Sequence, residues 1–331
     1  MQRAIELNPA VQAYLESARA RSTAQPRPNR PHAIPVRRPN TFLIGAMKSG
    51  TSYLSELLGA HPDAFMSWPK EPCHFVERRA LRKTWRVGWE HGYRRSTDRY
   101  LSLFAGAADA TVIAEASTVY SQAPRFRHVP ERILEFNPQA RFVYLLRDPI
   151  ERVISHYWHR VRWWGERRRI FSAIRSDPHY TDVSDYGRQL DLYLRLVPLE
   201  RVYVLTFERL VADPRSEMTR LYQWLGIDAH FWPDTLQVST NPTPSTIEQA
   251  RGFGWLDWIR RQRGYVRAAP YLPRAARRLG ARLAAREVRP AEARLTDVHD
   301  YLRPIQQAQT AALARLLKRS FPEWTTLYRP E

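Results

Sequence analysis

The chain is poor in cysteine, in acidic residues and in long apolar runs. Cys73 is the single cysteine among 331 residues, which excludes an internal disulfide and suits a reducing compartment. No apolar run approaches the roughly 18 residues that a membrane-spanning helix needs, and the N-terminal residues lack the apolar core of a secretory signal. We therefore expect a soluble, cytoplasmic protein without a transmembrane segment, and peripheral membrane contact stays open.

Acidic residues are outnumbered by basic ones, because 33 Asp and Glu face 52 Lys and Arg, a formal net charge of +19. This excess favours an anionic partner such as a nucleotide, a sulfated or phosphorylated glycan, nucleic acid or a membrane surface. Apolar residues make up 44% of the chain and charged residues 26%, which excludes a wholly disordered protein. No set of His, Cys, Asp and Glu has the spacing of metal ligands, so we expect no metal site.

Four short apolar segments, β-branched or aromatic and continuous, predict parallel strands that are buried on both faces. They are Thr41–Gly45, Thr111–Glu115, Arg141–Leu146 and Arg201–Phe207. The patterns between them predict helices, which include Thr51–Ala60, Glu131–Phe136, Ile150–Trp164 and Ser216–Leu225. This alternation indicates an α/β fold, in which a parallel sheet is flanked by helices and its strands are joined by right-handed crossovers.

Two segments differ from this alternation. Residues 1–40 are interpreted as an N-terminal arm, with a short helix at Ile5–Ala20 followed by a Pro- and Arg-rich linker, and this arm is either a mobile tail or a docking segment for a partner subunit. Residues 41–331 form the predicted globular domain. Within it, the Arg- and aromatic-rich segment 251–289 and a helix at Asp297–Phe321 predict a C-terminal helical cap. The Arg-rich segment is either a solvated face or a polyanion-binding surface, and the oligomeric state does not follow from the sequence.

The first predicted strand runs through Lys48-Ser49-Gly50-Thr51-Ser52 into a helix. A tight turn between a strand and a helix N-terminus binds phosphate through free backbone N–H groups and the helix dipole. Gly50 lets the backbone approach an anion closely, and Lys48 supplies a compact positive charge. Because Lys48 precedes the glycine by two residues, the turn departs from the NTPase pattern G-x-x-x-x-G-K-[ST]. The alternative is an ordinary strand–helix turn with an exposed lysine.

A second candidate site follows the third predicted strand. Arg147 ends that strand and Ser155 lies on the next helix, so both can face the crevice in which α/β proteins bind ligands. A guanidinium group grips a phosphate in a bidentate manner, while a hydroxyl group satisfies another oxygen. The alternative is a surface ion pair of Arg147 with Asp148 or Glu151.

Taken together, these segments resemble the sulfotransferases that use 3′-phosphoadenosine 5′-phosphosulfate (PAPS), in the branch with heparan sulfate sulfotransferases and their bacterial relatives. The resemblance covers about residues 41–230 and follows the order of the family's motifs. The main matches are Lys48-Ser49-Gly50-Thr51 to K-x-G-T, Lys70-Glu71-Pro72-Cys73-His74-Phe75 to K-E-x-x-F-F, Ala114-Glu115-Ala116-Ser117-Thr118-Val119-Tyr120 to G-E-K-S-P-x-Y, and Leu146 through His159 to L-R-D-P-x-E-R-x-x-S-x-Y-x-H.

The resemblance implies a P-loop-like sulfotransferase fold, PAPS as a co-substrate without a metal, and an acceptor with a hydroxyl group. Lys48 would lie at the 5′-phosphate and the bridging oxygen, and Arg147 with Ser155 would hold the 3′-phosphate. Carried over residue by residue, the PAPS-binding set is Lys48, Ser49, Gly50, Thr51, Ser52, Arg147, Ser155, Tyr186 and, in place of a family loop that this chain lacks, Arg261 and Arg263.

The resemblance also implies a general base. Glu71 matches the carboxylate proposed for this role in the glycan-modifying branch, and the proline after it predicts an extended backbone at Glu71. His74, which stands where the family has an aromatic residue, is the alternative base. Glu71, His74 and Glu115 are the predicted acceptor-binding residues, although Glu115 could instead orient the lysine of the turn. Ala116 replaces a family lysine, which removes one cation from the site.

The likeness to the glycan branch favours a carbohydrate or glycolipid hydroxyl as the acceptor, with a polyketide or other small alcohol as the alternative. A P-loop kinase or NTPase is a competing class, but the shifted lysine and the missing Mg²⁺-binding carboxylate pattern argue against it. A nonenzymatic polyanion or nucleic-acid binder, built on residues 251–289, is another. We expect a sulfotransferase without a nucleic-acid partner.

Overall fold

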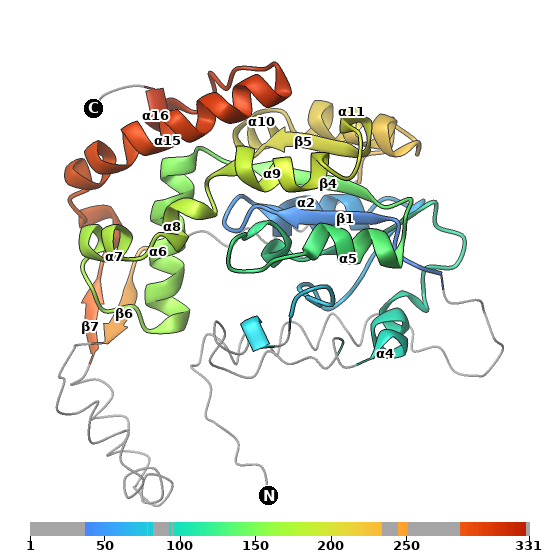
Figure 1. Ribbon diagram of the computed structural model, residues 1–331, viewed down its shortest axis with the longest axis horizontal. Helices are drawn as coiled ribbons and strands as arrows, with labels where there is room; N and C mark the ends of the chain where they lie inside the picture. The colour runs from blue at the N-terminus through green and yellow to red at the C-terminus, as the bar shows by residue number, and fades with distance from the viewer. Residues whose placement is uncertain are drawn as a thin grey trace, which may run out of the picture.

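A five-stranded parallel sheet forms the centre of the protein, with the strand order β2-β3-β1-β4-β5 (Figure 1). The structure is a computed structural model that describes residues 37–77, 79–81, 93, 96–233, 244–250 and 285–328. The strands are β1 (Thr41–Gly45), β2 (Ala64–Met66), β3 (Val112–Ala116), β4 (Arg141–Leu146) and β5 (Val202–Thr206). The predicted α/β fold is therefore confirmed.

All four predicted strands match observed strands to within one residue at each end. The last one was predicted one residue too long at each end, because Arg201 ends η3 (Leu199–Arg201) and Phe207 begins α10 (Phe207–Ala212). β2, the edge strand, was not predicted. It is three residues long, which is too short for a hydrophobic pattern to identify a strand.

Helices cover both faces of the sheet, as expected for parallel strands. Leu43, Val143 and Leu205 point to one face, where they pack on α2 and α11. Phe42 and Phe142 point to the other face. The helices of the first face are α2 (Thr51–Gly59), α10 and α11 (Pro214–Leu225), and those of the second are α4 (Thr97–Leu101), α5 (Val129–Phe136), α6 (Pro149–Trp164), α9 (Tyr186–Leu194) and α15 (Thr296–Leu317).

The predicted C-terminal helix is α15, which packs on α9 and α6 (red in Figure 1). It ends at Leu317 instead of continuing to Phe321, because Lys318 adopts the left-handed conformation that ends helices. The remaining elements are η1 (Ser102–Phe104), η2 (Thr118–Ser121), α7 (Ile170–Ser176), α8 (His179–Asp182), η3 (Leu199–Arg201), β6 (Ile247–Ala250), antiparallel to β7 (Ala285–Val288), η5 (Pro290–Glu292) and α16 (Thr325–Tyr328).

Several predicted features lie outside the described residues. These are the helix at Ile5–Ala20 and most of both the arm and the Arg-rich segment 251–289. Residues 37–40, the last of the predicted arm, contact the domain. The Asn40 backbone N–H donates to the Ile113 carbonyl at 2.8 Å. Among the described helices, none is both long enough and apolar enough to cross a membrane.

The junction of β4 and α6 depends on Asp148. Its Oδ1 accepts the backbone N–H groups of Ile150 (3.0 Å) and Glu151 (3.3 Å), which caps α6, and Pro149 occupies the first helical turn. Its Oδ2 accepts the backbone N–H of Leu327 at 3.0 Å. One buried carboxylate therefore fixes both the start of α6 and the C-terminal helix α16.

We predict that Asp148→Ala lowers the free energy of unfolding by about 2–4 kcal/mol, through loss of the cap and an unsatisfied buried N–H at Leu327. Urea unfolding followed by circular dichroism measures this loss. Asp213→Ala is the matched control, since the exposed Asp213 caps α11 through the Ser216 N–H alone. Equal losses in the two variants would show that Asp148 is only a helix cap.

Candidate active site

The turn between β1 and α2 leads into a helix N-terminus that no side chain caps. Gly50, the residue before α2, has a φ of 88° and makes no side-chain capping bond, and the first turn of α2 has no acidic residue. Lys48 also has a positive φ of 69°, while Ser49 is fully buried. The backbone N–H groups at the start of α2 have no partner within the helix, so they are available to an anion.

Two glycines allow close packing around this turn. A Cβ at Gly50 would lie 2.4 Å from the Phe207 ring, and a Cβ at Gly45 would lie 2.1 Å from Ser121 Oγ. Both glycines have a positive φ, which other residues adopt only with strain. The Ser121 hydroxyl donates to the Ile44 carbonyl at 2.9 Å. The turn is therefore held tightly between η2 and α10.

Positive charge gathers around Lys48. Burial and neighbouring cations lower the pKa of the Lys48 ammonium group to about 8. In decreasing order of effect, these cations are Arg147, Arg162, Lys70 and Arg152. Repulsion among like charges in a partly buried site is costly, and a bound anion would relieve it. The electrostatics of the turn thus favour an anionic ligand.

Lys70 reaches the same turn from the loop after β2. Its Nζ donates to Thr51 Oγ1 at 2.8 Å and to Ser52 Oγ at 3.1 Å. Burial lowers the pKa of Lys70 to about 8, although the charge of Glu71 opposes this shift. Lys70 was not among the site residues predicted from the sequence. Its position directly before Glu71 is the sequence feature that could have identified it as one.

Arg147 follows β4 and lies against the turn between β1 and α2. Its Nη1 donates to the Lys48 carbonyl at 3.4 Å, and its guanidinium carbon lies 5.4 Å from the centre of the Phe207 ring. Its Nη2 pairs with the Glu151 carboxylate at 3.4 Å, which is the alternative pair expected from the sequence. The Tyr186 hydroxyl donates to the Arg147 carbonyl at 2.8 Å. The structure thus brings Arg147 and Tyr186 to the turn.

Helix α6 carries a row of polar residues near the turn. Arg152, Ser155, His159 and Arg162 follow one another at spacings of three or four residues, so they share one helix face. Burial and the charges of Lys48 and Arg162 lower the pKa of His159 to about 3, which places a neutral imidazole near Lys48. Neither His159 nor Arg162 was predicted as a site residue.

Arg152 is fully buried on α6 without a carboxylate partner among the described residues. Its Nε donates to Ser184 Oγ at 2.5 Å and its Nη2 donates to the Tyr180 carbonyl. Burial lowers the pKa of Arg152 to about 10. Because its bonds go to neutral acceptors, its charge is not neutralised and adds to the positive field at the turn.

Glu71 lies in the loop after β2, where Thr118 binds both of its carboxylate oxygens. The Thr118 hydroxyl donates to Oε1 and the Thr118 N–H to Oε2, each at 2.9 Å. Burial raises the pKa of Glu71, while Lys70 and Thr118 oppose the rise. The predicted extended backbone is wrong, because Glu71 has a φ of 61°. Its N–H donates to the Ala116 carbonyl, so contacts with the end of β3 override the preference that Pro72 imposes.

His74 lies in an aromatic cluster on the second face of the sheet. Its ring stacks on Tyr100, with centroids 4.1 Å apart and planes inclined by 7°, and packs edge-on against Phe75 at 5.0 Å. Its Nδ1 is 2.8 Å from the Tyr93 carbonyl, so a protonated Nδ1 donates to that oxygen. Of the two candidate bases, His74 is thus engaged in packing, whereas Glu71 lies beside Lys70.

Glu115 is fully buried on β3. Burial raises the pKa of its carboxyl group to about 8, and the charge of Glu71 adds to the rise. The hydroxyl groups of Tyr120 and Tyr100 oppose the rise, although neither meets the geometry of a hydrogen bond. The structure therefore places Glu115 in the core behind Glu71, away from solvent.

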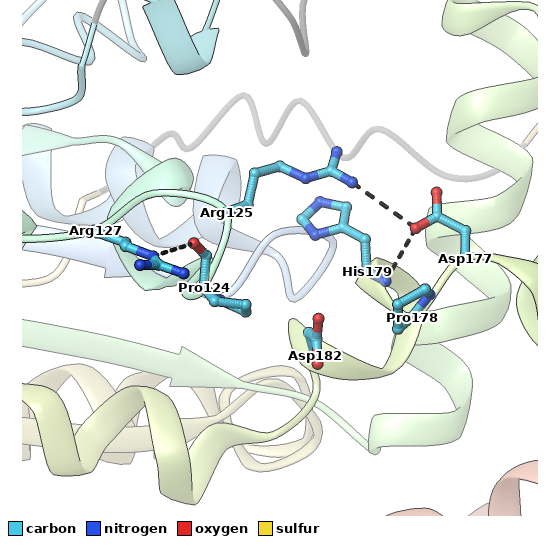
Figure 2. A pocket seen from close by; sticks show the side chains of 7 residues that line it. All are labelled: Pro124, Arg125, Arg127, Asp177, Pro178, His179 and Asp182. Atoms are coloured by element: carbon cyan, nitrogen blue, oxygen red, sulfur yellow. Dashed lines mark hydrogen bonds and ion pairs between the residues drawn. The ribbon is translucent and has the colours of Figure 1, made fainter.

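One surface hollow lies apart from the turn, and two predicted site residues cannot be compared with the structure. Arg261 and Arg263 are outside the described residues. The surface hollow has a volume of about 240 Å³. Arg125 pairs there with Asp177 at 3.8 Å, and Figure 2 shows His179 beside this pair. The hollow contains none of the residues predicted as site residues. Within the described part of the chain, no three His, Cys, Asp or Glu side chains are grouped as metal ligands.

We predict that Lys48→Met stabilises the ligand-free protein at pH 7 by about 1–3 kcal/mol, because it removes a cation whose pKa falls from 10.5 to about 8 on folding. Since the unfolded chain binds more protons between these values, wild-type stability should rise with pH from 8 to 10, and less so in the variant. Thermal unfolding with and without pyrophosphate measures both effects, and the wild type should gain more stability from the anion than the variant does.

Lys318→Met is the control for this comparison, since Lys318 is exposed at the end of α15 and its loss should change stability by less than about 0.5 kcal/mol. A destabilised Lys48→Met variant would contradict an electrostatic cost at the turn.

Comparisons with known proteins agree with this geometry. Residues 39–234, more than half of the chain, match the model described as "Sulfotransferase family". The human heparan sulfate glucosamine 3-O-sulfotransferase 6 is 28% identical over 214 residues, which are 59% of this chain and 55% of that protein. Its mouse counterpart is 26% identical over 257 residues, 72% of this chain and 66% of that protein.

The chain spans about half the length of the first of these curated relatives. The fold is similar to that of a solved sulfotransferase from Alicyclobacillus acidocaldarius, with a TM-score of 0.60, 23% identity, and coverage of 87% of this chain and 99% of that one. The strand order around the turn between β1 and α2 agrees with the family match over more than half of the chain. The chain belongs to the sulfotransferase family.

Proposed function

We propose that this protein transfers a sulfuryl group from PAPS to a hydroxyl group of an acceptor. The observation that carries the proposal is the gathering of cations around the uncapped N-terminus of α2. These cations are Lys48, Lys70, Arg147 and Arg162. These cations offer positive charge to a polyanion, and the turn adds its hydroxyl groups and the free N–H groups of the helix N-terminus. Family membership makes PAPS the anion that this arrangement suits.

The donor would be held at both of its ends. Lys48 and the turn from Ser49 to Ser52 would bind the phosphosulfate end, while Arg147 and Ser155 would bind the 3′-phosphate. Arg147 lies 3.4 Å from the Lys48 carbonyl, so one ligand can contact both residues. Tyr186 supports this placement, because its hydroxyl holds the backbone at Arg147.

Transfer depends on positioning and charge. The acceptor oxygen forms a bond to sulfur, the bond from sulfur to the bridging oxygen breaks, and negative charge grows on the leaving phosphate. Lys48 supplies a fixed positive charge where that charge develops. A bound polyanion raises the pKa of Lys48 again by offsetting the neighbouring cations, which keeps Lys48 protonated.

Glu71 accepts the proton that the acceptor hydroxyl loses. It can do so only when ionised, and Lys70 and Thr118 stabilise that form against the effect of burial. Activity should therefore increase with pH through the pKa of Glu71. The packing of His74 against Tyr100 makes His74 the weaker candidate.

A carbohydrate or glycolipid hydroxyl is the acceptor class we propose. The curated relatives carry names that specify glucosamine of heparan sulfate, but this chain matches about half of their length at 28% identity or less. The net charge of +19 also suits an acidic glycan. Polyketide-like and other small alcohols form the second arm of an acceptor panel with radiolabelled PAPS.

We predict that Arg147→Ala weakens binding of adenosine 3′,5′-bisphosphate by about 1.5–3 kcal/mol, the usual range for hydrogen bonds to charged groups. Binding of adenosine 5′-phosphate should change little, because it lacks the 3′-phosphate. Calorimetry measures both affinities. Arg195→Ala, which removes an exposed arginine on the surface, is the control. If wild-type protein binds the two nucleotides equally, the donor assignment fails.

We predict that Glu71→Gln reduces single-turnover transfer by about 10²–10⁴-fold while leaving bisphosphate affinity unchanged, since the amide keeps the shape of the side chain but cannot accept the proton. Rapid-quench assays with radiolabelled PAPS and an active acceptor measure the rate. His74→Phe, which keeps the aromatic packing, should retain most of the transfer. The opposite pattern would assign the base to His74.

A further inference from the structure

One residue, Thr118, donates hydrogen bonds to both oxygens of the Glu71 carboxylate. Thr118, the first residue of η2, donates its hydroxyl to Oε1 and its N–H to Oε2, each at 2.9 Å. The Cys73 thiol lies 3.9 Å from Oε2, but its single S–H has a nearer acceptor in the Glu71 backbone carbonyl at 3.1 Å. Each carboxylate oxygen can accept about two hydrogen bonds, so Oε1 can accept one more besides that from Thr118. Thr118 alone binds both oxygens and so fixes the orientation of the carboxylate.

This arrangement is specific to the residue at position 118. Thr118 stands where the motif G-E-K-S-P-x-Y has proline, which has neither an N–H nor a hydroxyl to donate. The segment from Glu71 to Cys73 has positive φ at both ends, 61° and 53°, so the loop is held in a strained conformation by its contacts. Thr118 supplies two of these contacts, and its side chain is only 8% exposed.

The other charged and titratable groups near Glu71 do not provide this orientation. The Lys70 ammonium group donates to the hydroxyl groups of Thr51 and Ser52 and acts on Glu71 through charge. Glu115, on β3, acts on Glu71 only through repulsion. Cys73, in the same loop, donates its thiol to the Glu71 backbone carbonyl at 3.1 Å and only lies near Oε2, at 3.9 Å. Thr118 is thus the neighbour that both binds and aims the carboxylate.

We propose that Thr118 is a positioning residue that keeps Glu71 ionised and directs Oε1 toward the acceptor hydroxyl. The proposal rests on the proposed sulfuryl transfer, in which Glu71 takes the acceptor's proton. Hydrogen bonds to a carboxylate favour its charged form, so Thr118 lowers the pH at which Glu71 becomes able to act.

A merely structural role would give a different result. If Thr118 only docks η2 onto the loop after β2, its replacement would lower thermal stability and total activity at every pH alike. A positioning role instead moves the acidic limb of the pH–rate profile. The test therefore measures the titration of Glu71 directly and, separately, the pH dependence of transfer.

The experiment compares full-length wild type with Thr118→Val, Thr118→Ser and Thr118→Pro. Valine removes the hydroxyl and keeps the N–H, serine keeps both donors, and proline removes both. Glu71 is titrated by NMR in protein labelled with [5-¹³C]glutamate, and its signal is assigned by its loss in Glu71→Gln. Single-turnover transfer is measured over the same pH range. Thr206→Val is the matched control, since it removes a threonine–glutamate bond of 2.8 Å to Glu323.

In Thr118→Val, the titration midpoint of Glu71 and the acidic limb of transfer should both move up by about one pH unit. Transfer below that limb should then fall about tenfold, while the rates converge at high pH. Thr118→Ser and Thr206→Val should titrate as wild type does, and Thr118→Pro should shift further than Thr118→Val. Bisphosphate affinity should be the same in all variants.

An unchanged Glu71 midpoint in Thr118→Val would overturn the proposal, and so would a uniform loss of activity at all pH values. If wild-type protein transfers no sulfuryl group to any acceptor, the proposed function fails, yet the NMR titration still decides whether Thr118 holds the Glu71 carboxylate ionised. The two failures are therefore distinguishable.

Discussion

The positive charge gathered at the N-terminus of α2 is the constraint on which the rest of the site depends. Burial and the charges of Arg147 and Lys70 lower the pKa of Lys48, and burial lowers the pKa of Lys70. Fully buried Arg152 adds to that field without a carboxylate to neutralise it among the described residues. A bound polyanion would offset the cost of gathering these charges, as the proposed function requires.

The acidic groups nearest to this cluster are already engaged. Asp148 accepts three backbone N–H groups, from the start of α6 and from α16. Glu208 accepts the Asp148 N–H at 2.8 Å and the Trp324 indole N–H at 3.2 Å. These carboxylates therefore connect the C-terminal segment to the sheet instead of pairing with the lysines. Glu151, by contrast, pairs with Arg147 at 3.4 Å, and the charge of Glu71 acts on Lys70.

The surroundings of two neighbouring carboxyl groups, Glu71 and Glu115, differ. Glu71 and Glu115 both lose solvation, but Glu71 gains hydrogen bonds from Thr118 and the charge of Lys70, whereas Glu115 faces tyrosine hydroxyls. Two carboxyl groups near each other thus differ in how readily they ionise. Such a difference suits one group to proton transfer and the other to a place in the core.

Local sequence was sufficient for four of the five strands of the sheet, for the turn between β1 and α2 and for the start of α6. Gly50 and Asp148 act on residues within a few positions of themselves, so strand, turn and cap follow from short patterns. The contacts that complete the site join residues far apart, since 47 positions separate Glu71 from Thr118 and 19 separate Lys70 from Thr51. The pairing of β2 with β3 brings Glu71 to Thr118, and the pairing of β3 with β1 brings the loop after β2 close to the turn that precedes α2. No local pattern encodes the register of these neighbouring strands.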